Sequence, residues 1–182
     1  MTPGAAPGET LETGRLRLEL LRPDDPDDEA LYLTLYTSAE VMARIAPPLD
    51  EGSARRAFGR VARFNGTDRP GHRHWSVRAR DSGDRIGIVG LLRTGADVEL
   101  GGLLLPEWWN RRVSREAYGR VIQHAFETPG IDLVFGERPD DDHARIIDRL
   151  FAPLGLARVT GKARAPDACR WELSRWKWAA RP

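Results

Sequence analysis

A run of three strand-like segments in the middle third constrains the fold most. The segments are HWSVRAR (74–80), RIGIVGLLRT (85–94) and ADVELGGLLL (96–105). The clusters DSGD and TGAD separate them, and both are typical of tight turns. We therefore expect three consecutive antiparallel strands at the centre of a sheet.

Segments on either side of this run alternate between helical and strand periods. RLRLELL (15–21) predicts a strand, and helices are expected within 22–38, 39–45 and 51–66. A helix from Arg112, a strand at 131–137 and a helix from about Asp140 to Leu150 follow the central run. The last predicted strands are LARVTGKARA (156–165) and ACRWELSRWKW (168–178). This order predicts a mixed sheet with helices on its faces.

Composition excludes several classes of protein. The 182 residues are 41% apolar and 30% charged with a net charge of +1, which is typical of a globular protein and gives no general reason to expect nucleic acid or membrane as a partner. Cys169 is the one cysteine, so we expect a reducing, cytoplasmic setting. We expect residues 1–10 to form a flexible leader and residues 11–178 to form one domain.

Four stretches, in this order of elements, resemble the GNAT superfamily of acyl-CoA-dependent N-acyltransferases. They are LETGRLRLELLRPDD (11–25), DSGDRIGIVGLL (81–92), VELGGLLLPEWW (98–109) and SREAYGRVIQHAFE (114–127). The chain looks closest to the branch that includes ribosomal-protein N-terminal acetyltransferases, over about residues 11–176. The resemblance implies an α/β (α+β) GNAT fold, a mixed, mostly antiparallel sheet of about seven strands flanked by about four to five helices.

The same resemblance implies a site for acetyl-CoA or another acyl-CoA as co-substrate. The strand matching 98–105 is expected to end in a bulge that splays it from the strand matching 131–137, and the pantetheine arm is expected to pair with the exposed backbone. The pyrophosphate is expected at the turn that follows. The implied contacts are Leu103, Leu104 and Leu105 for the arm, and Arg111, Arg112, Val113 and Ser114 for the pyrophosphate.

Two departures from the family pattern leave alternatives open. In WNRRVSREA (109–117), Asn110 and Arg112 replace glycines that permit positive φ and close approach of phosphate oxygens. The Arg112 side chain either swings outward and pairs with a phosphate or fills the space of the diphosphate. Asp141 and Ala144 stand where the family commonly has an Asn and a Ser that help to hold CoA.

N-acylation needs a deprotonated amine, a polarised thioester carbonyl and a stabilised thiolate. The resemblance implies Glu99 as general base, and the alternative is a solvent-facing carboxylate or one tied to an arginine. Many relatives use a tyrosine as acid in the helix after the strand at 131–137, but residues 140–154 contain none. His143 is the nearby group that titrates in the neutral range, whereas Tyr118 is expected to pack.

Aromatic residues and histidines give a candidate substrate pocket, formed by His74, Trp75 and Trp108, with core packing as the alternative for the tryptophans. His72 and His74 lie on one face of a strand, but no third ligand is evident, so no metal is predicted.

We therefore expect an acetyl-CoA-dependent N-acetyltransferase that acts on a primary amine of a small molecule or on a peptide N-terminus. The alternative is a GNAT-fold protein that has lost CoA use and serves as a ligand-binding module or catalyses a different reaction in the same cleft. A third hypothesis, a nucleic-acid-binding adaptor, is supported only by the many arginines. A homodimer is possible on this sequence.

Overall fold

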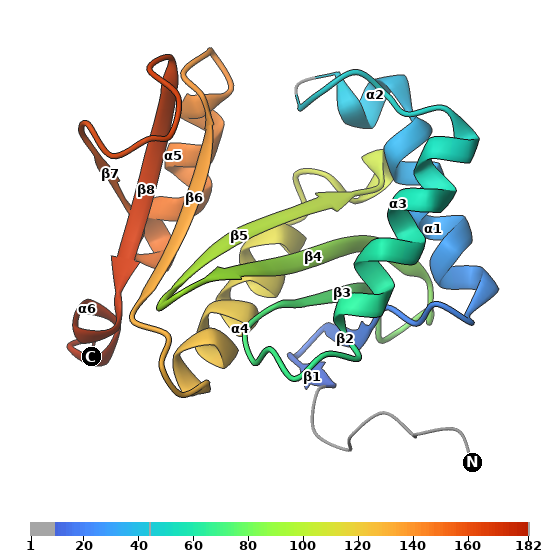
Figure 1. Ribbon diagram of the computed structural model, residues 1–182, viewed down its shortest axis with the longest axis horizontal. Helices are drawn as coiled ribbons and strands as arrows, with labels where there is room; N and C mark the ends of the chain where they lie inside the picture. The colour runs from blue at the N-terminus through green and yellow to red at the C-terminus, as the bar shows by residue number, and fades with distance from the viewer. Residues whose placement is uncertain (1–9, 44, 182) are drawn as a thin grey trace.

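One mixed sheet organises the chain, and the computed structural model describes residues 10–43 and 45–181 (Figure 1). The strand order is β1-β2-β3-β4-β5-β6-β8-β7, and all neighbours are antiparallel apart from β5 and β6. The strands are β1 (Leu11–Glu12), β2 (Leu16–Leu20), β3 (Arg73–Ala79), β4 (Arg85–Thr94), β5 (Asp97–Leu104), β6 (Leu133–Pro139), β7 (Ala157–Val159) and β8 (Ala168–Ser174). Residues 1–9 of the expected leader lie outside the described residues.

Helices cover both faces of the sheet (Figure 1). Of the first three, α1 and α3 lie over β3 and β4, and α2 packs against α1, while α4 and α5 lie on the opposite face. The helices are α1 (Pro26–Thr37), α2 (Ala39–Met42), α3 (Glu51–Phe64), α4 (Val113–Glu127), α5 (Ala144–Phe151) and α6 (Arg175–Ala179), with 3-10 turns η1 (Pro106–Trp108) and η2 (Ala152–Leu154). None of the described helices is long and apolar enough to span a bilayer.

Alternation along the strands divides the interior into two cores. Trp75 and Val89 are typical of the larger core, where the sheet packs against α4 and α5. Leu35, Phe58 and Ile88 are typical of the smaller core, under α1 and α3. Successive strand residues point to opposite faces, so the central strands are buried on both sides.

The predicted fold class is confirmed, with three consecutive antiparallel strands near the centre of the sheet. Eight strands form instead of about seven because the two-residue β1 pairs with the edge of β2. The strand predicted over 168–178 is wrong beyond Ser174, because its partner β6 begins at Leu133, opposite Ser174. The chain turns there into α6. Likewise, α5 begins at Ala144 and not near residue 140.

The parallel pair β5–β6 positions the site described below. The two strands are in register only from Asp97–Glu99 with Leu133–Phe135, and then they separate. Beyond that point β5 stays paired with β4 alone, in unbroken register through Leu104. The separation therefore does not need the bulge that we expected at the end of β5.

One arginine ties α1 to the hairpin of β3 and β4. Arg85 donates hydrogen bonds of 2.7–3.0 Å to Asp25, Asp27 and Asp28. The side chain of Asp28 is only 3% exposed. Burial raises the pKa of Asp28 even though the Arg22 amide and Arg85 donate to its carboxylate. A carboxylate buried to this extent depends on its cation.

Replacement of Arg85 by alanine should therefore destabilise the protein strongly. We expect a loss of about 3–5 kcal/mol in the free energy of unfolding, because Asp28 would be left buried without its partner. The matched control is Arg22→Ala, which breaks an exposed ion pair with Asp24 and should cost less than about 1 kcal/mol. Urea unfolding measures both, and equal losses would show that Asp28 does not depend on Arg85.

Candidate functional site

The opening between β5 and β6 is lined by backbone groups of β5. Leu105 donates its amide to Ile86 of β4, so by alternation Leu104 and Gly102 direct their backbone groups toward β6. Two side chains donate to these carbonyls: the Trp109 indole to Leu104 at 2.9 Å and the Tyr118 hydroxyl to Gly102 at 3.4 Å. The opening thus has a defined set of backbone groups on one side.

Tyr118 reaches the opening because Gly102 has no side chain. A Cβ at Gly102 would lie 3.1 Å from the tyrosine hydroxyl and 2.7 Å from the Ile88 carbonyl oxygen. Burial raises the pKa of Tyr118, so its hydroxyl remains protonated at neutral pH and is a hydrogen-bond donor.

The turn between β5 and α4 has the backbone shape that glycines usually provide. Asn110 and Arg112 both have φ of 60°, and Arg112 is the left-handed residue just before Val113 begins α4. The Arg112 side chain makes no capping bond, and the first-turn amides of a helix have no partner within the helix. Arg15 donates to the Arg111 carbonyl at 3.2 Å and steadies the turn. An anion can therefore approach these amides.

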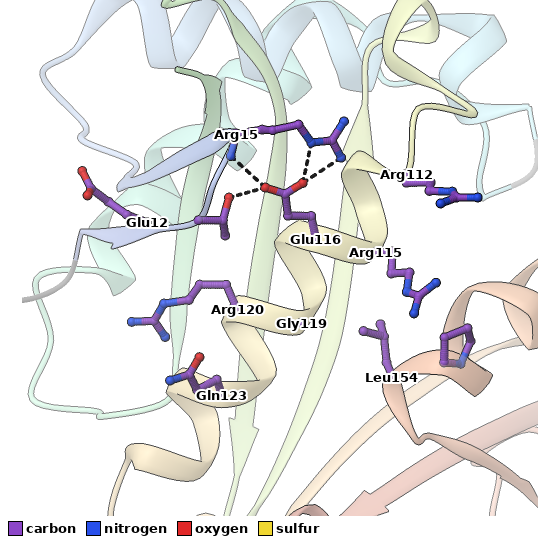
Figure 2. Close-up of a pocket in the computed structure, with 11 residues that line it drawn as sticks. Glu12, Arg15, Arg112, Arg115, Glu116, Gly119, Arg120, Gln123 and Leu154 are labelled. Atoms are coloured by element: carbon purple, nitrogen blue, oxygen red, sulfur yellow. Dashed lines mark hydrogen bonds and ion pairs between the residues drawn. The ribbon is translucent and has the colours of Figure 1, made fainter. Parts of the chain in front are cut away.

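Arg112 lies beside a surface hollow of about 670 Å³ on the outer side of α4. Figure 2 shows Arg112 and Arg115 extending to the side of α4 on which Leu154 of η2 lies. Both arginines are exposed, and within residues 10–43 and 45–181 neither forms an ion pair. The Arg112 side chain thus extends outward beside α4 (Figure 2).

Glu116 joins the start of α4 to the segment between β1 and β2 (Figure 2). Its carboxylate accepts hydrogen bonds from the Thr13 hydroxyl, the Arg15 amide and the Arg15 guanidinium. Burial opposes ionisation, but these hydrogen bonds outweigh it and hold the pKa of Glu116 below its usual value. Glu116 and Arg15 are thus engaged with each other and brace the hollow from one end.

Glu99 is on the same face of the sheet as α1 and α3. These helices cover β3 and β4 on that face. Its Oε2 accepts from Arg164 Nη2 at 2.8 Å, and its side chain is 24% exposed. Oε1 of Glu99 has no partner in the described part of the chain. Glu99 is thus paired with an arginine, which is one of the two arrangements expected from the sequence. Its second carboxylate oxygen, Oε1, is not used in this pair.

Arg164 belongs to an alternating row of charges on this face of β5, β6 and β8, which we call the charge ladder. Its members are Glu99, Arg164, Glu137, Arg170, Glu172 and Lys162. The Glu137 side chain is 6% exposed, whereas Arg164 and Lys162 are 64% and 60% exposed. The segment between β7 and β8 therefore covers buried carboxylates with exposed cations.

The predicted residues around α5 are engaged locally. Asp141 accepts two hydrogen bonds from Arg138 and one each from the His143 and Ala144 amides. Burial opposes ionisation of Asp141, but the His143 amide and Arg138 hold its pKa below the usual value. His143 stands immediately before α5. As a CoA contact, Asp141 would have to share oxygens that already bind Arg138.

The three predicted pocket residues are not brought together. His74 lies against Gly90 on the α3 side of the sheet, where a Cβ at Gly90 would be 2.8 Å from its Nε2. Trp75 points to the opposite face, is fully buried and packs edge-on against His124. Neighbouring residues on a strand cannot share a pocket. Trp108 lies in η1, and the Arg111 guanidinium stacks over its ring, 5.1 Å from the ring centre.

Burial favours the neutral forms of His74 in β3 and of His72 just before it. It lowers the pKa of His74 to about 4, with a smaller contribution from His72, and it also lowers the pKa of His72. Among the residues that the structure describes, no group of three or more His, Cys, Asp or Glu side chains could hold a metal ion.

Three features of the site could not be read from the sequence. The sequence indicates a packing role for Tyr118, and only the position of Gly102 shows that its hydroxyl meets β5. Arg164 lies 65 residues from Glu99, and no local pattern predicts such a pair. The grouping of Arg112 and Arg115 with Leu154 depends likewise on the packing of η2 against α4.

Comparison with known proteins identifies the family. A family model described as an acetyltransferase (GNAT) domain matches residues 15–163. No curated protein sequence matches the chain significantly.

Similar solved structures support the same fold. An acetyltransferase from Agrobacterium tumefaciens has a TM-score of 0.74 at 22% identity, covering 90% of this chain and 93% of its own. A spermidine N-acetyltransferase from Vibrio cholerae, in complex with CoA and spermine, has 0.73 at 14% identity, covering 92% and 99%. A ribosomal-protein alanine acetyltransferase from Vibrio fischeri has 0.70 at 12% identity, covering 95% and 99%. At these identities the likeness is one of fold.

Arg112→Gly should stabilise the protein slightly. The left-handed conformation costs a residue with a side chain about 1–2 kcal/mol, whereas glycine adds about 0.4–1 kcal/mol of entropy to the unfolded chain. We expect a net gain between zero and about 1.5 kcal/mol. Asn110→Gly is the matched control at the same φ and should gain less, because asparagine tolerates this conformation better. Urea unfolding measures both variants. A lower free energy of unfolding in Arg112→Gly than in the wild type would show that Arg112 is not strained.

The free energy of unfolding should decrease when the pH is lowered, because His74 takes up a proton more readily in the unfolded chain. Its folded pKa of about 4 lies below the ordinary 6.5, so the unfolded chain binds the proton more tightly between these values. Stability is then complete above pH 6.5 and declines as the pH falls toward 4. Urea midpoints measured across this range should decline less in His74→Asn, and an identical decline would exclude His74 as the titrating group.

Proposed function

The chain belongs to the GNAT acetyltransferase family, and from this premise we propose that it transfers an acetyl group from acetyl-CoA to a primary amine. The acceptor is a small molecule or a peptide N-terminus. One observation carries the proposal: β5 and β6 separate after Glu99, and the free edge of β5 leads directly to the left-handed turn before α4. This edge and turn form one continuous surface for an extended ligand with a phosphate at one end.

The edge of β5 suits the amides of a pantetheine arm. An extended chain adds to an exposed strand through main-chain hydrogen bonds, and Gly102 and Leu104 face the opening. Their carbonyls already accept from Tyr118 and Trp109, so their N–H groups are the ones left for a ligand. Leu103 and Leu105 pack away from the opening, in the smaller core. The predicted contacts at 103–105 thus act through Leu104 and its backbone.

The turn suits the diphosphate. Amides at the start of α4 and the positive end of the helix dipole favour an anion. Arg111, Arg112, Val113 and Ser114 supply this backbone, and the Arg112 side chain is exposed beside α4 (Figure 2). We propose that the loss of the glycines is compensated by conformation, so that CoA use is retained.

Residues on the two sides of the opening would supply the acid–base chemistry. CoA supplies an activated thioester. Oε1 of Glu99 is placed to accept the proton that the amine loses when its nitrogen bonds to the acyl carbon, while Arg164 holds Oε2. The protonated hydroxyl of Tyr118 would leave the Gly102 carbonyl and donate its proton to the departing thiolate, a role that the sequence assigns to His143. Neither step needs a metal.

Glu99→Gln tests the base. We expect kcat to fall about 10²–10⁴-fold, with unchanged affinity for CoA in isothermal titration. Glu19→Gln is the matched control, because Glu19 is also a strand carboxylate paired with arginines, on β2. Activity is followed as thiol release from acetyl-CoA with a panel of amines: a polyamine, free amino acids and short peptides.

Two outcomes would contradict the proposal in different ways. If Glu99→Gln keeps its kcat, Glu99 serves only as the partner of Arg164. If the wild-type protein does not bind CoA at millimolar concentrations, it is a GNAT-fold protein that has lost CoA, and its opening has another role.

A further inference from the structure

Arg164 places a cation directly beside the carboxylate of Glu99. Its Nη2 donates to Oε2 of Glu99 at 2.8 Å, while its backbone amide and its Nε donate to Oε1 of Glu137 at 2.7 and 3.2 Å. Nη1 makes no hydrogen bond to any residue within 10–43 and 45–181, and the side chain is 64% exposed. Arg164 therefore keeps a charged donor for a ligand that binds at Glu99.

The Arg164 guanidinium is held in place before any ligand arrives. Its Cζ lies 5.8 Å from the ring centre of Phe135, a buried residue on β6, and Glu137 fixes the Nε end. An exposed arginine without such contacts loses rotamer freedom when it binds a ligand. Since Arg164 is already ordered, less of that entropy is lost when an anion binds to Nη1.

The face of β5 beside Glu99 has room for a small ligand. Gly101 follows Glu99 by two positions, so both residues point to the same face of the strand. Gly101 is exposed, and a Cβ built on it would meet no heavy atom of a non-adjacent described residue within 4 Å. An acceptor can therefore lie over β5 with its amine at Oε1 of Glu99.

Proton transfer to Glu99 changes the charge that Arg164 meets. Before the transfer, Arg164 is paired with the Glu99 carboxylate. When Oε1 takes the proton of the amine, Glu99 becomes neutral. Arg164 is then left with Glu137, which already pairs with the buried Arg170 at 3.4 Å. A carboxylate on the acceptor would replace the lost negative charge, and an interaction that strengthens during the reaction raises kcat as well as affinity.

We propose that the acceptor carries a carboxylate a few bonds away from its amine. The amine meets Oε1 of Glu99, and the carboxylate accepts a charge-assisted hydrogen bond from Nη1 of Arg164. This substrate class rests on the proposed function, because it takes Glu99 as the base. A polyamine would bring further positive charge to the exposed Arg164 and would leave Nη1 without an acceptor.

Two kinds of acceptor share this chemistry. A free amino acid presents its α-carboxylate, whereas a peptide with an acidic first residue presents the carboxylate of that side chain. Both place the anion a few bonds from the primary amine. The experiment therefore includes a matched pair of acceptors for each.

Steady-state kinetics at saturating acetyl-CoA tests the substrate class. Free amino acids are compared with their α-amides, and a tripeptide that begins with glutamate is compared with its counterpart that begins with glutamine. The wild type should prefer the carboxylate member of one pair. Arg164→Gln should lower that preference in kcat/KM about tenfold or more, since a hydrogen bond to a charged group contributes about this factor. The pair that responds identifies the kind of acceptor.

Lys162→Gln is the matched control. It removes one exposed positive charge from the same segment between β7 and β8, where Lys162 pairs with Glu172, and it should keep the preference. Arg164→Lys retains the charge and should recover part of the preference that Arg164→Gln loses. The preference is a ratio measured on one enzyme sample, so a general loss of activity or of folded protein cancels out of it.

Isothermal titration gives a second measurement that needs no turnover. An N-acetylated amino acid and an N-acetylated peptide that begins with glutamate are titrated into the whole protein, each beside its amide counterpart. The carboxylate form of the responding pair should bind more tightly to the wild type. Arg164→Gln should remove this difference, and Lys162→Gln should keep it.

The substrate class and the proposed function fail in distinguishable ways. If Arg164→Gln leaves both ratios unchanged, or if the wild type acetylates spermidine better than either carboxylate acceptor, the substrate class is wrong while acetyl transfer stands. If the protein acetylates no amine but binds an N-acetylated carboxylate through Arg164, the proposed function is wrong while the carboxylate site stands. Equal effects of Arg164→Gln and Lys162→Gln would show a diffuse charge effect and overturn the carboxylate site.

Discussion

The short parallel pairing of β5 with β6 is the constraint on which the rest of the structure depends. Three residue pairs join the strands, and beyond Glu99 each strand has only one neighbour. Backbone groups on such an edge need partners, and Tyr118 and Trp109 satisfy two of the carbonyls. On the other side of the opening, Gly136 of β6 packs closely on Phe151 of α5. The sheet thus stays continuous where β5 and β6 begin, while the edge of β5 remains unpaired toward its end.

In the turn before α4, residues with side chains adopt a backbone shape that glycine usually provides. Arg112 adopts a conformation that glycine favours, and the cost is met by contacts on both sides of the turn. The Trp109 indole holds the turn to β5, and Arg15 holds the Arg111 carbonyl. Strain of this kind persists where surrounding contacts determine it and is concentrated at functional sites. The Arg112 side chain is exposed and extends to the same side of α4 as Arg115 (Figure 2).

Sequence reasoning predicted what depends on local pattern. The period of two over residues 74–105 located β3, β4 and β5, and the resemblance located the turn at 109–113. It could not predict that β8 ends at Ser174, because that end is set by where β6 begins. Nor could it predict that Glu99 meets Arg164 or that Tyr118 meets Gly102, since both contacts join distant segments. The conformation of Arg112 is likewise decided by tertiary contacts, against its own preference.

The central claim is that the amides at the start of α4 still receive a diphosphate although Asn110 and Arg112 have replaced glycines. The most direct measurement is a two-dimensional ¹⁵N–¹H spectrum of the labelled protein during titration with CoA. If the diphosphate binds at the start of α4, the amide signals of Val113, Ser114 and Arg115 will shift the most and saturate together. Signals that stay in place at saturating CoA, or largest shifts away from the turn and the edge of β5, would contradict this binding site.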